Sequence, residues 1–285
     1  MIDIIALVDQ GDYSAAWHCC QAMGPNPPGS HEGLITSLLD DWMRLSEDEK
    51  KATPVFCDNR SLNQQFVSCG PSGVRRDRLL LVFCDMGQRF GGCPLNLLHR
   101  VLGRLGINLL YLRDQDDVFY LNGFRQDGFD LTTTIRRIQA LANEHSISTI
   151  LAMGSSSGGF AALHWGLALE ARRILSLAGP TDLSRSLHAI TEKQAALGVP
   201  TRLRADRAAA AAAERLRYQH CRSRFHLVHA AANNHDKRFA RDLGLPLPAH
   251  VTVEPLPDSQ AHNVMIPLVQ QRRLRPLLLE LVGPG

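Results

Sequence analysis

The spacing of hydrophobic positions changes near residue 52 of this chain. Before that point, residues 3–23 and 31–45 carry apolar side chains at helical spacing, and a glycine–aspartate pair splits the first stretch into two short segments. After it, short apolar runs of strand length alternate with helical segments. We therefore predict a small N-terminal helical segment over residues 1–50 and a larger domain over residues 52–285.

The larger domain is predicted to contain a mostly parallel sheet. The centre of the run RDRLLLVFCD, residues 76–85, is continuously apolar, which is typical of a strand buried on both faces. Strand and helix alternate about six times, which favours right-handed crossovers with helices on both faces of the sheet. The predicted strands are 54–58, 64–70, 76–85, 107–114, 147–154, 173–180, 224–231 and 251–257; the predicted helices are 96–106, 129–145, 160–171, 204–218, 239–244 and 264–282, the last with a break near Pro276. The fold class is therefore α/β, and functional groups are expected at the carboxyl ends of the strands.

One of these strand ends carries a stretch that fits the motif G-x-S-x-G, running from Gly154 to Gly158 with Ser156 at its centre. A sharp strand-to-helix turn forces its central residue towards positive φ, and a Cβ two residues before or after it would collide with the turn. The two glycines therefore predict that the Ser156 hydroxyl stands above the sheet edge, at the N-terminus of the next helix. The alternative is a Gly/Ser loop that binds phosphate, but G-x-x-x-x-G-K-[ST] is absent and G-x-G-x-x-G does not fit here.

In this motif and in the order of its elements, the chain resembles the α/β-hydrolases over roughly residues 52–285. The resemblance implies a nucleophilic serine that is followed along the chain by an acid and then by a histidine. His262 lies after the last predicted strand and before the last predicted helix, where that family has its catalytic histidine. Asp236 is the only carboxylate in the loop after strand 224–231 and is the expected acid, although an aspartate there could also be a helix N-cap. Asp182, one strand earlier, and Asp258 are the alternative acids.

The resemblance also implies an oxyanion hole made of two backbone N–H groups, those of Ser157 and of Met86. The Met86 loop, DMGQRFGG, is rich in glycine, which allows a close backbone approach, but it differs from the H-G-G-G type of many lipases. A carboxylate at Asp85 would oppose a developing negative charge if it pointed inward. We therefore expect Asp85 to turn away and to hold the loop, with Arg89 as its partner.

Composition changes this picture little. The hydrophobic fraction of 45% supports one large core, and a formal net charge of +3 does not favour nucleic-acid binding. Local groups of arginines near residues 202–207 and 272–275 are interpreted as solvated helix faces, with an anionic substrate or a membrane surface as the alternative.

Metal and membrane sites are not predicted either. The seven cysteines include no C-x-x-C pair, and His226 and His229 lie at an odd spacing that directs them to opposite faces of one strand. No apolar run approaches the roughly 20 residues of a membrane span, and the N-terminus has no basic region of the kind that begins a signal peptide. We expect a cytoplasmic protein with free thiols and no cofactor.

The implied activity is that of a serine hydrolase. Ser156 would attack the carbonyl of an ester or thioester, His262 would take its proton, and water would release the acyl group from the acyl-enzyme. Two alternatives stay open: an acyltransferase on the same fold, and a non-catalytic binding protein of the same fold. The substrate is expected to be a small molecule or an acyl-carrying partner, and the N-terminal helices are a candidate surface for a partner or a second copy.

Overall fold

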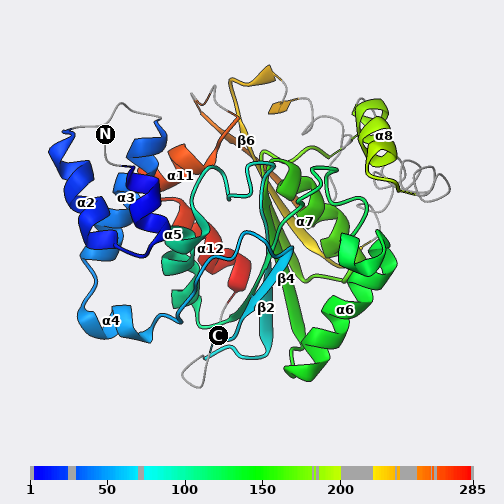
Figure 1. The fold of residues 1–285 in the computed structure, drawn as a ribbon, viewed down its shortest axis with the longest axis horizontal. Helices are drawn as coiled ribbons and strands as arrows, with labels where there is room; N and C mark the ends of the chain where they lie inside the picture. The colour runs from blue at the N-terminus through cyan, green and yellow to red at the C-terminus, as the bar shows by residue number, and fades with distance from the viewer. Residues whose placement is uncertain are drawn as a thin grey trace.

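The computed structural model describes residues 3–24, 30–69, 74–181, 183, 186–199, 221–234, 236–237, 249–257, 259 and 262–283. Its α-helices are α1 (Ile4–Asp9), α2 (Tyr13–Ala22), α3 (His31–Met43), α4 (Glu47–Ala52), α5 (Leu95–Leu102), α6 (Leu131–Glu144), α7 (Ser157–Ala168), α8 (Leu187–Ala196), α11 (Met265–Gln270) and α12 (Leu274–Val282), with short 3₁₀ turns η1 (Gly103–Leu105) and η2 (Arg125–Asp127) (Figure 1). Its strands are β1 (Gln64–Val67), β2 (Arg78–Phe83), β3 (Asn108–Leu112), β4 (Thr149–Ser155), β5 (Arg173–Leu177), β6 (Arg224–Ala230) and β7 (Val251–Leu256). The predicted helices 204–218 and 239–244 lie outside the described residues.

The strands form one sheet in the order β1-β3-β2-β4-β5-β6-β7. Strands β2 to β7 pair in parallel, and only the edge strand β1 of this sheet pairs antiparallel, with β3. The predicted α/β class, with a mostly parallel sheet flanked by helices, is therefore confirmed. Its carboxyl edge is the place where Ser155 ends β4 and Leu177 ends β5.

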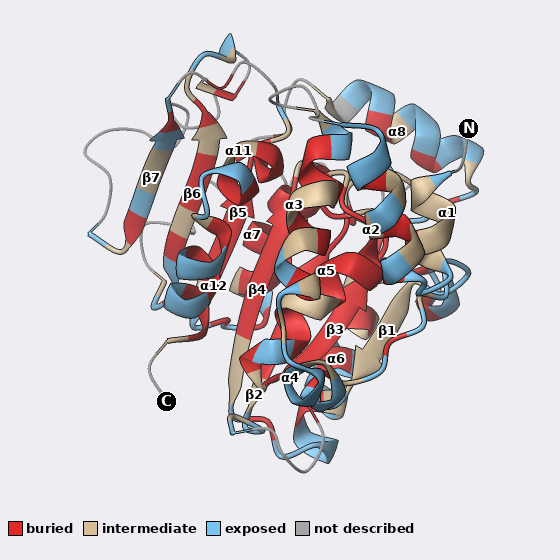
Figure 2. Cartoon of the chain, turned by 90° about the vertical axis from the view of Figure 1, so that its left-hand side faces the viewer, coloured by how far each residue is buried: buried red, intermediate tan, exposed pale blue. Residues whose placement is uncertain are grey.

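Helices cover both faces of the sheet, and β2 shows why its sequence is apolar throughout. Leu80 and Val82 pack into a core shared with α5, α11, α12 and the N-terminal helices, whereas Leu79 and Leu81 pack into a second core with α6 and α7. Figure 2 shows α3 and α5 lying in front of the sheet. Because alternate side chains of a strand point to opposite faces, a strand covered on both sides must be apolar at every position.

The N-terminal helices belong to the first of these cores. Val8 and Leu34 are fully buried in the same cluster as the sheet residues Leu80 and Val82. Each helix begins at a residue whose side chain accepts hydrogen bonds from the first turn: Asp3, Asp12, Ser30 and Ser46. The segment therefore covers one face of the sheet, and its treatment as a unit separate from residues 52–285 stays a prediction.

Two local predictions are wrong. Residues 54–58 form no strand, because their backbone groups bond to side chains: Pro54 O contacts His99 Nε2 at 2.8 Å, and Asp58 N–H donates to Asn96 Oδ1 at 3.1 Å. The last helix does not break at Pro276 but between α11 and α12, at residues 271–273, where Arg272 has a φ of 57°. Pro276 lies in the first turn of α12, where a proline displaces no intrahelical hydrogen bond.

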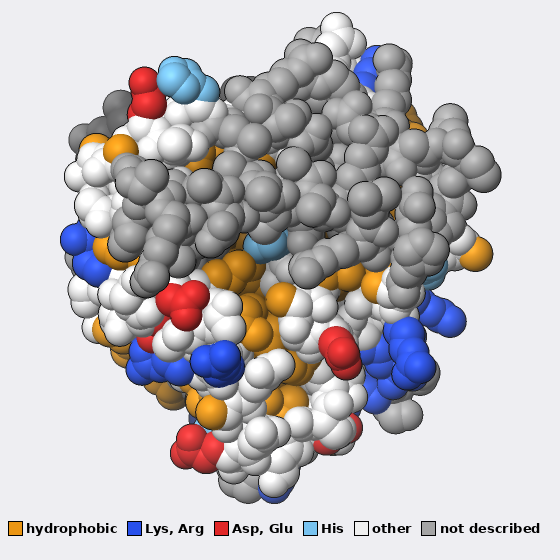
Figure 3. Space-filling model, turned by 90° about the vertical axis from the view of Figure 1, so that its right-hand side faces the viewer, with side chains coloured by type: hydrophobic (Ala, Val, Ile, Leu, Met, Phe, Trp, Pro, Cys, Tyr) orange, Lys and Arg blue, Asp and Glu red, His pale blue; other side chains and the backbone are white. Residues whose placement is uncertain are grey.

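The face opposite the N-terminal helices carries charged side chains of both signs around a central group of apolar side chains (Figure 3). Among the described residues, no helix has both the length and the apolar character needed to cross a membrane.

Candidate active site

Ser156 occupies a strained turn between β4 and α7. Its φ is 54° and its ψ is −120°, a conformation that residues other than glycine rarely adopt. The Ser156 N–H donates to Leu177 O at 2.8 Å, so the turn is fastened to the end of the neighbouring strand β5. The hydroxyl therefore leaves the sheet at its carboxyl edge, at the start of a helix.

The two flanking glycines are required by close backbone contacts. A Cβ on Gly154 would lie 1.9 Å from the carbonyl oxygen of Gly158, and a Cβ on Gly158 would lie 2.4 Å from that of Phe83. Both distances are shorter than any real Cβ contact. The steric reason proposed for the motif, that neither flank has room for a side chain, is therefore confirmed.

Three side chains that are far apart in the sequence form a continuous hydrogen-bonded relay. His262 Nε2 lies 2.8 Å from Ser156 Oγ, and His262 Nδ1 lies 2.8 Å from Asp236 Oδ1. Asp236 follows β6 and its side chain is fully buried, whereas that of His262, between β7 and α11, is 44% exposed. An Nδ1–H that donates to the carboxylate leaves Nε2 free to accept the serine proton, which is the tautomer a general base needs.

The electrostatics of this relay stabilise the charged form of the His262 imidazole relative to a free imidazole. The hydrogen bond to Asp236 raises the pKa of His262; burial opposes this, and the negative charges of Asp236 and Asp85 raise the pKa further. The buried carboxylate thus stabilises the imidazolium that forms when the serine gives up its proton.

Both residues expected to supply oxyanion donors lie next to Ser156 or its cavity. Ser157 is the first residue of α7, so its backbone N–H has no acceptor within the helix. Met86 lies in the loop after β2, and its N–H donates to no described residue. Two free N–H groups at this edge could hold a negatively charged oxygen.

Asp85 holds the Met86 loop from within, through backbone N–H groups. Its Oδ1 accepts from Gly87 N–H at 2.9 Å and from Arg89 N–H at 3.3 Å, and its Oδ2 accepts from Gly92 N–H at 3.2 Å. The partner expected at Arg89 is thus its backbone, not its guanidinium. Asn263, beside His262, donates to Gly91 O at 2.7 Å and ties the same loop to the histidine segment.

A cavity of about 550 Å³ opens beside Ser156 and His262. The Met86 loop forms part of its wall, and His31 and Arg60 form another part. His31 lies so close to Gly92 that a Cβ on this glycine would be 2.1 Å from the imidazole Cε1. Residues from the N-terminal part of the chain therefore line the cavity at the serine, and no sequence motif indicated them. A second cavity of about 590 Å³, at the start of β5 and β6, contains none of the relay residues.

The alternative acids Asp182 and Asp258 and the arginines of residues 202–207 lie outside the described residues. In the other arginine group, residues 272–275, Arg273 pairs with Glu254. All seven cysteines are described, and none forms a disulfide. No group of three or more histidine, cysteine, aspartate or glutamate side chains in the described part of the chain is arranged to hold a metal ion.

Comparison with known proteins finds similarity in structure. No protein-family model matches the chain, and no curated protein matches its sequence. Among solved structures, the chain is similar to a 2,6-dihydroxy-pseudo-oxynicotine hydrolase, at 15% identity and a TM-score of 0.52, over 99% of this chain and 87% of that one. It is also similar to a carboxylesterase of the thaumarchaeon Nitrososphaera gargenis, at 11% identity and a TM-score of 0.52, over 77% and 94% of the two chains.

A third similar structure is an acylaminoacyl peptidase, at 11% identity and a TM-score of 0.52; the alignment takes in 78% of this chain and 40% of the peptidase. At such low identity these similarities concern the fold alone. The chain therefore has the α/β-hydrolase fold, as its sequence predicts.

Proposed function

We propose that the chain is a serine hydrolase that cleaves a carboxylic ester or thioester through an acyl-enzyme. The observation that carries this proposal is the relay from Ser156 Oγ through His262 to Asp236, with both contacts at 2.8 Å. A serine hydroxyl is a weak nucleophile until a base takes its proton, and a buried carboxylate keeps that base in the right tautomer and orientation.

In this mechanism Ser156 attacks the acyl carbonyl as His262 Nε2 accepts its proton. The carbonyl oxygen becomes an oxyanion, which the N–H groups of Ser157 and Met86 stabilise. His262 then protonates the leaving alcohol or thiol, and the acyl group stays on Ser156. Water attacks this acyl-enzyme with His262 again as the base, and the serine is regenerated.

A fluorophosphonate probe tests the proposal, because it reacts covalently with an activated serine. We expect it to label Ser156 in the wild-type protein and to leave Ser156→Ala unlabelled. Ser155→Ala is the matched control: it removes the preceding hydroxyl of the serine triplet and should keep the label. A folded wild-type protein without label would contradict the proposal and favour the non-catalytic binding protein.

Hydrolysis is measured with p-nitrophenyl esters of increasing chain length, followed by acyl-thioesters. Ser156→Ala and His262→Ala should each lower kcat/KM by several orders of magnitude. The same reactions with an added alcohol or amine acceptor separate hydrolysis from transfer. A transferred acyl product in place of the free acid would make the chain an acyltransferase.

A further inference from the structure

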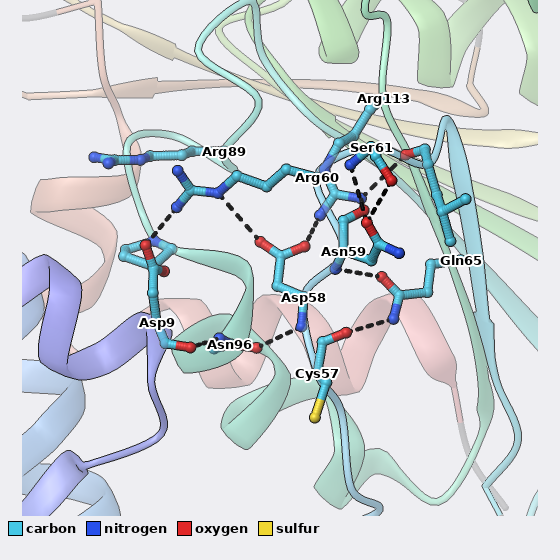
Figure 4. Close-up of polar contacts among 12 residues, drawn as sticks. Asp9, Cys57, Asp58, Asn59, Arg60, Ser61, Gln65, Arg89, Asn96 and Arg113 are labelled. Atoms are coloured by element: carbon cyan, nitrogen blue, oxygen red, sulfur yellow. Dashed lines mark hydrogen bonds and ion pairs between the residues drawn. The ribbon is translucent and has the colours of Figure 1, made fainter.

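Arg60, one of the two arginines that line the cavity at Ser156, is already paired within the protein. Its guanidinium lies 2.5 Å from Asp9 and 3.7 Å from Asp58. Asp58 also pairs with Arg113, whose side chain is fully buried (Figure 4). Two arginines and two aspartates thus balance one another behind this wall of the cavity.

Arg89, the other arginine that lines the cavity, has no carboxylate partner among the described residues. Its guanidinium forms no hydrogen bond or ion pair with any described residue, and Figure 4 shows it apart from the paired guanidinium of Arg60. Its backbone, in contrast, is fixed, because its N–H donates to Asp85 Oδ1 and its carbonyl accepts from Asp85 N–H at 2.7 Å. A half-buried cation, on a loop whose backbone is hydrogen-bonded, therefore lines the cavity that contains the nucleophile.

Asp85, in the same loop, is held by backbone groups and not by this guanidinium. Its two carboxylate oxygens are occupied by the backbone N–H groups of its own loop, and no ion pair joins it to the Arg89 guanidinium. A guanidinium has five N–H donors in a planar fork that matches the two oxygens of a carboxylate. The missing partner is therefore expected to enter with the substrate.

We propose that the substrate carries a carboxylate in addition to its scissile ester or thioester, and that Arg89 binds this carboxylate. The inference rests on the proposed function and names the substrate class of the same site. Arg89 and Met86 belong to one loop that Asp85 holds together, so anchoring the carboxylate also directs the reacting carbonyl towards the Met86 N–H. Arg89 is thus a specificity-determining residue, and it takes no part in proton transfer.

Two matched pairs of esters test the proposal. For an acyl-side carboxylate, p-nitrophenyl hydrogen glutarate is compared with p-nitrophenyl valerate; for a leaving-group carboxylate, 4-acetoxybenzoate is compared with 4-acetoxybenzamide. In at least one pair we expect kcat/KM to favour the charged ester by about tenfold to a hundredfold, the range of one charge-assisted contact. Arg89→Gln should abolish that preference, by lowering kcat/KM of the charged ester to that of its neutral counterpart.

Two variants separate Arg89 from general charge effects. Arg89→Lys keeps the charge without the planar fork and should retain only part of the preference. Arg104→Gln removes the same charge at a residue that does not line the cavity, and it should keep the wild-type preference. The inference is overturned if neither pair shows a preference or if the preference survives in Arg89→Gln. Failure of the proposed function would look different from failure of this inference. In that case the wild-type protein would neither take the fluorophosphonate label nor hydrolyse the neutral esters.

Discussion

Gly158 is the position where one added methyl group should lower activity even while the protein stays folded. Its Cβ would lie 2.4 Å from the Phe83 carbonyl oxygen and 2.5 Å from that of Cys84. These carbonyls end β2 and lead into the Met86 loop, so they cannot rotate away as a flexible side chain would. In Gly158→Ala, the distance from the new Cβ to the Phe83 carbonyl oxygen must increase from 2.4 Å to an ordinary contact of 3.4 Å. α7 and the end of β2 must therefore separate by about 1 Å.

The energies of this separation can be compared. Overpacking of this kind costs about 1–3 kcal/mol, and the higher helix propensity of alanine offsets up to about 1 kcal/mol. The net loss of stability should therefore lie between about 0 and 3 kcal/mol. A displacement of about 1 Å between Ser156 and the Met86 N–H should instead lower kcat/KM about a hundredfold.

The assay measures kcat/KM on a p-nitrophenyl ester together with urea unfolding. Gly166→Ala is the matched control, because it lies in the same helix but its Cβ would meet only side chains, most closely Ile174 Cδ1 at 2.7 Å. This control should keep near wild-type activity and change stability by about 1 kcal/mol or less. Wild-type activity in Gly158→Ala, or an equal loss in both variants, would refute the reasoning.

The remaining predictions concern pH and buried charge. Asp236→Asn should move the rising limb of the pH profile of kcat/KM to lower pH, because the hydrogen bond that raises the pKa of His262 is weakened; an unmoved limb contradicts this. Burial lowers the pKa of His99 to about 4, so the unfolded chain takes a proton near pH 6.5 and the folded chain does not. Stability should therefore fall as pH drops from about 6.5 to about 4, by about 2 kcal/mol at pH 5, and a urea-unfolding series with His99→Gln should show a flatter profile. Arg113→Met should destabilise the fold by about 3–5 kcal/mol in the same assay, because it leaves the buried Asp58 without its main partner; a loss below about 1 kcal/mol would show that Arg60 alone suffices.

The features that the sequence predicted well are those set by local chemistry. The continuous apolar run of β2 and the glycines around Ser156 each reflect contacts within a few residues or with an adjacent strand. These patterns predicted the sheet and the serine turn, whereas the candidates His262 and Asp236 came from the resemblance to the α/β-hydrolases, which implies the order serine, acid, histidine along the chain. The distances of 2.8 Å from His262 to Ser156 Oγ and to Asp236 Oδ1 lie at the carboxyl edge of the sheet.

What the sequence could not predict depends on side chains from distant segments. Residues 54–58 carry a strand-like pattern, yet Phe56 is buried against the rings of His99 and Tyr111, and the backbone bonds to side chains rather than to a strand. The short helix α4 does carry a local signal, a capping box from Ser46 to Glu49, but its surface shows no buried position from which apolar periodicity could be read.

The residues that line the cavity show most clearly that contacts between distant segments could not be predicted from the sequence. His31 and Arg60 come from segments whose hydrophobic pattern indicates only that they cover the sheet, and Arg89 comes from a loop. Periodicity reports which residues face a core; it carries no information on which polar residues around a cavity already have partners. That distinction separates Arg60, satisfied by Asp9 and Asp58, from Arg89, and only the latter can bind a substrate carboxylate without breaking an existing ion pair. The proposed choice of substrate therefore depends on a charge balance among residues that are far apart in the sequence, from Asp9 to Arg113.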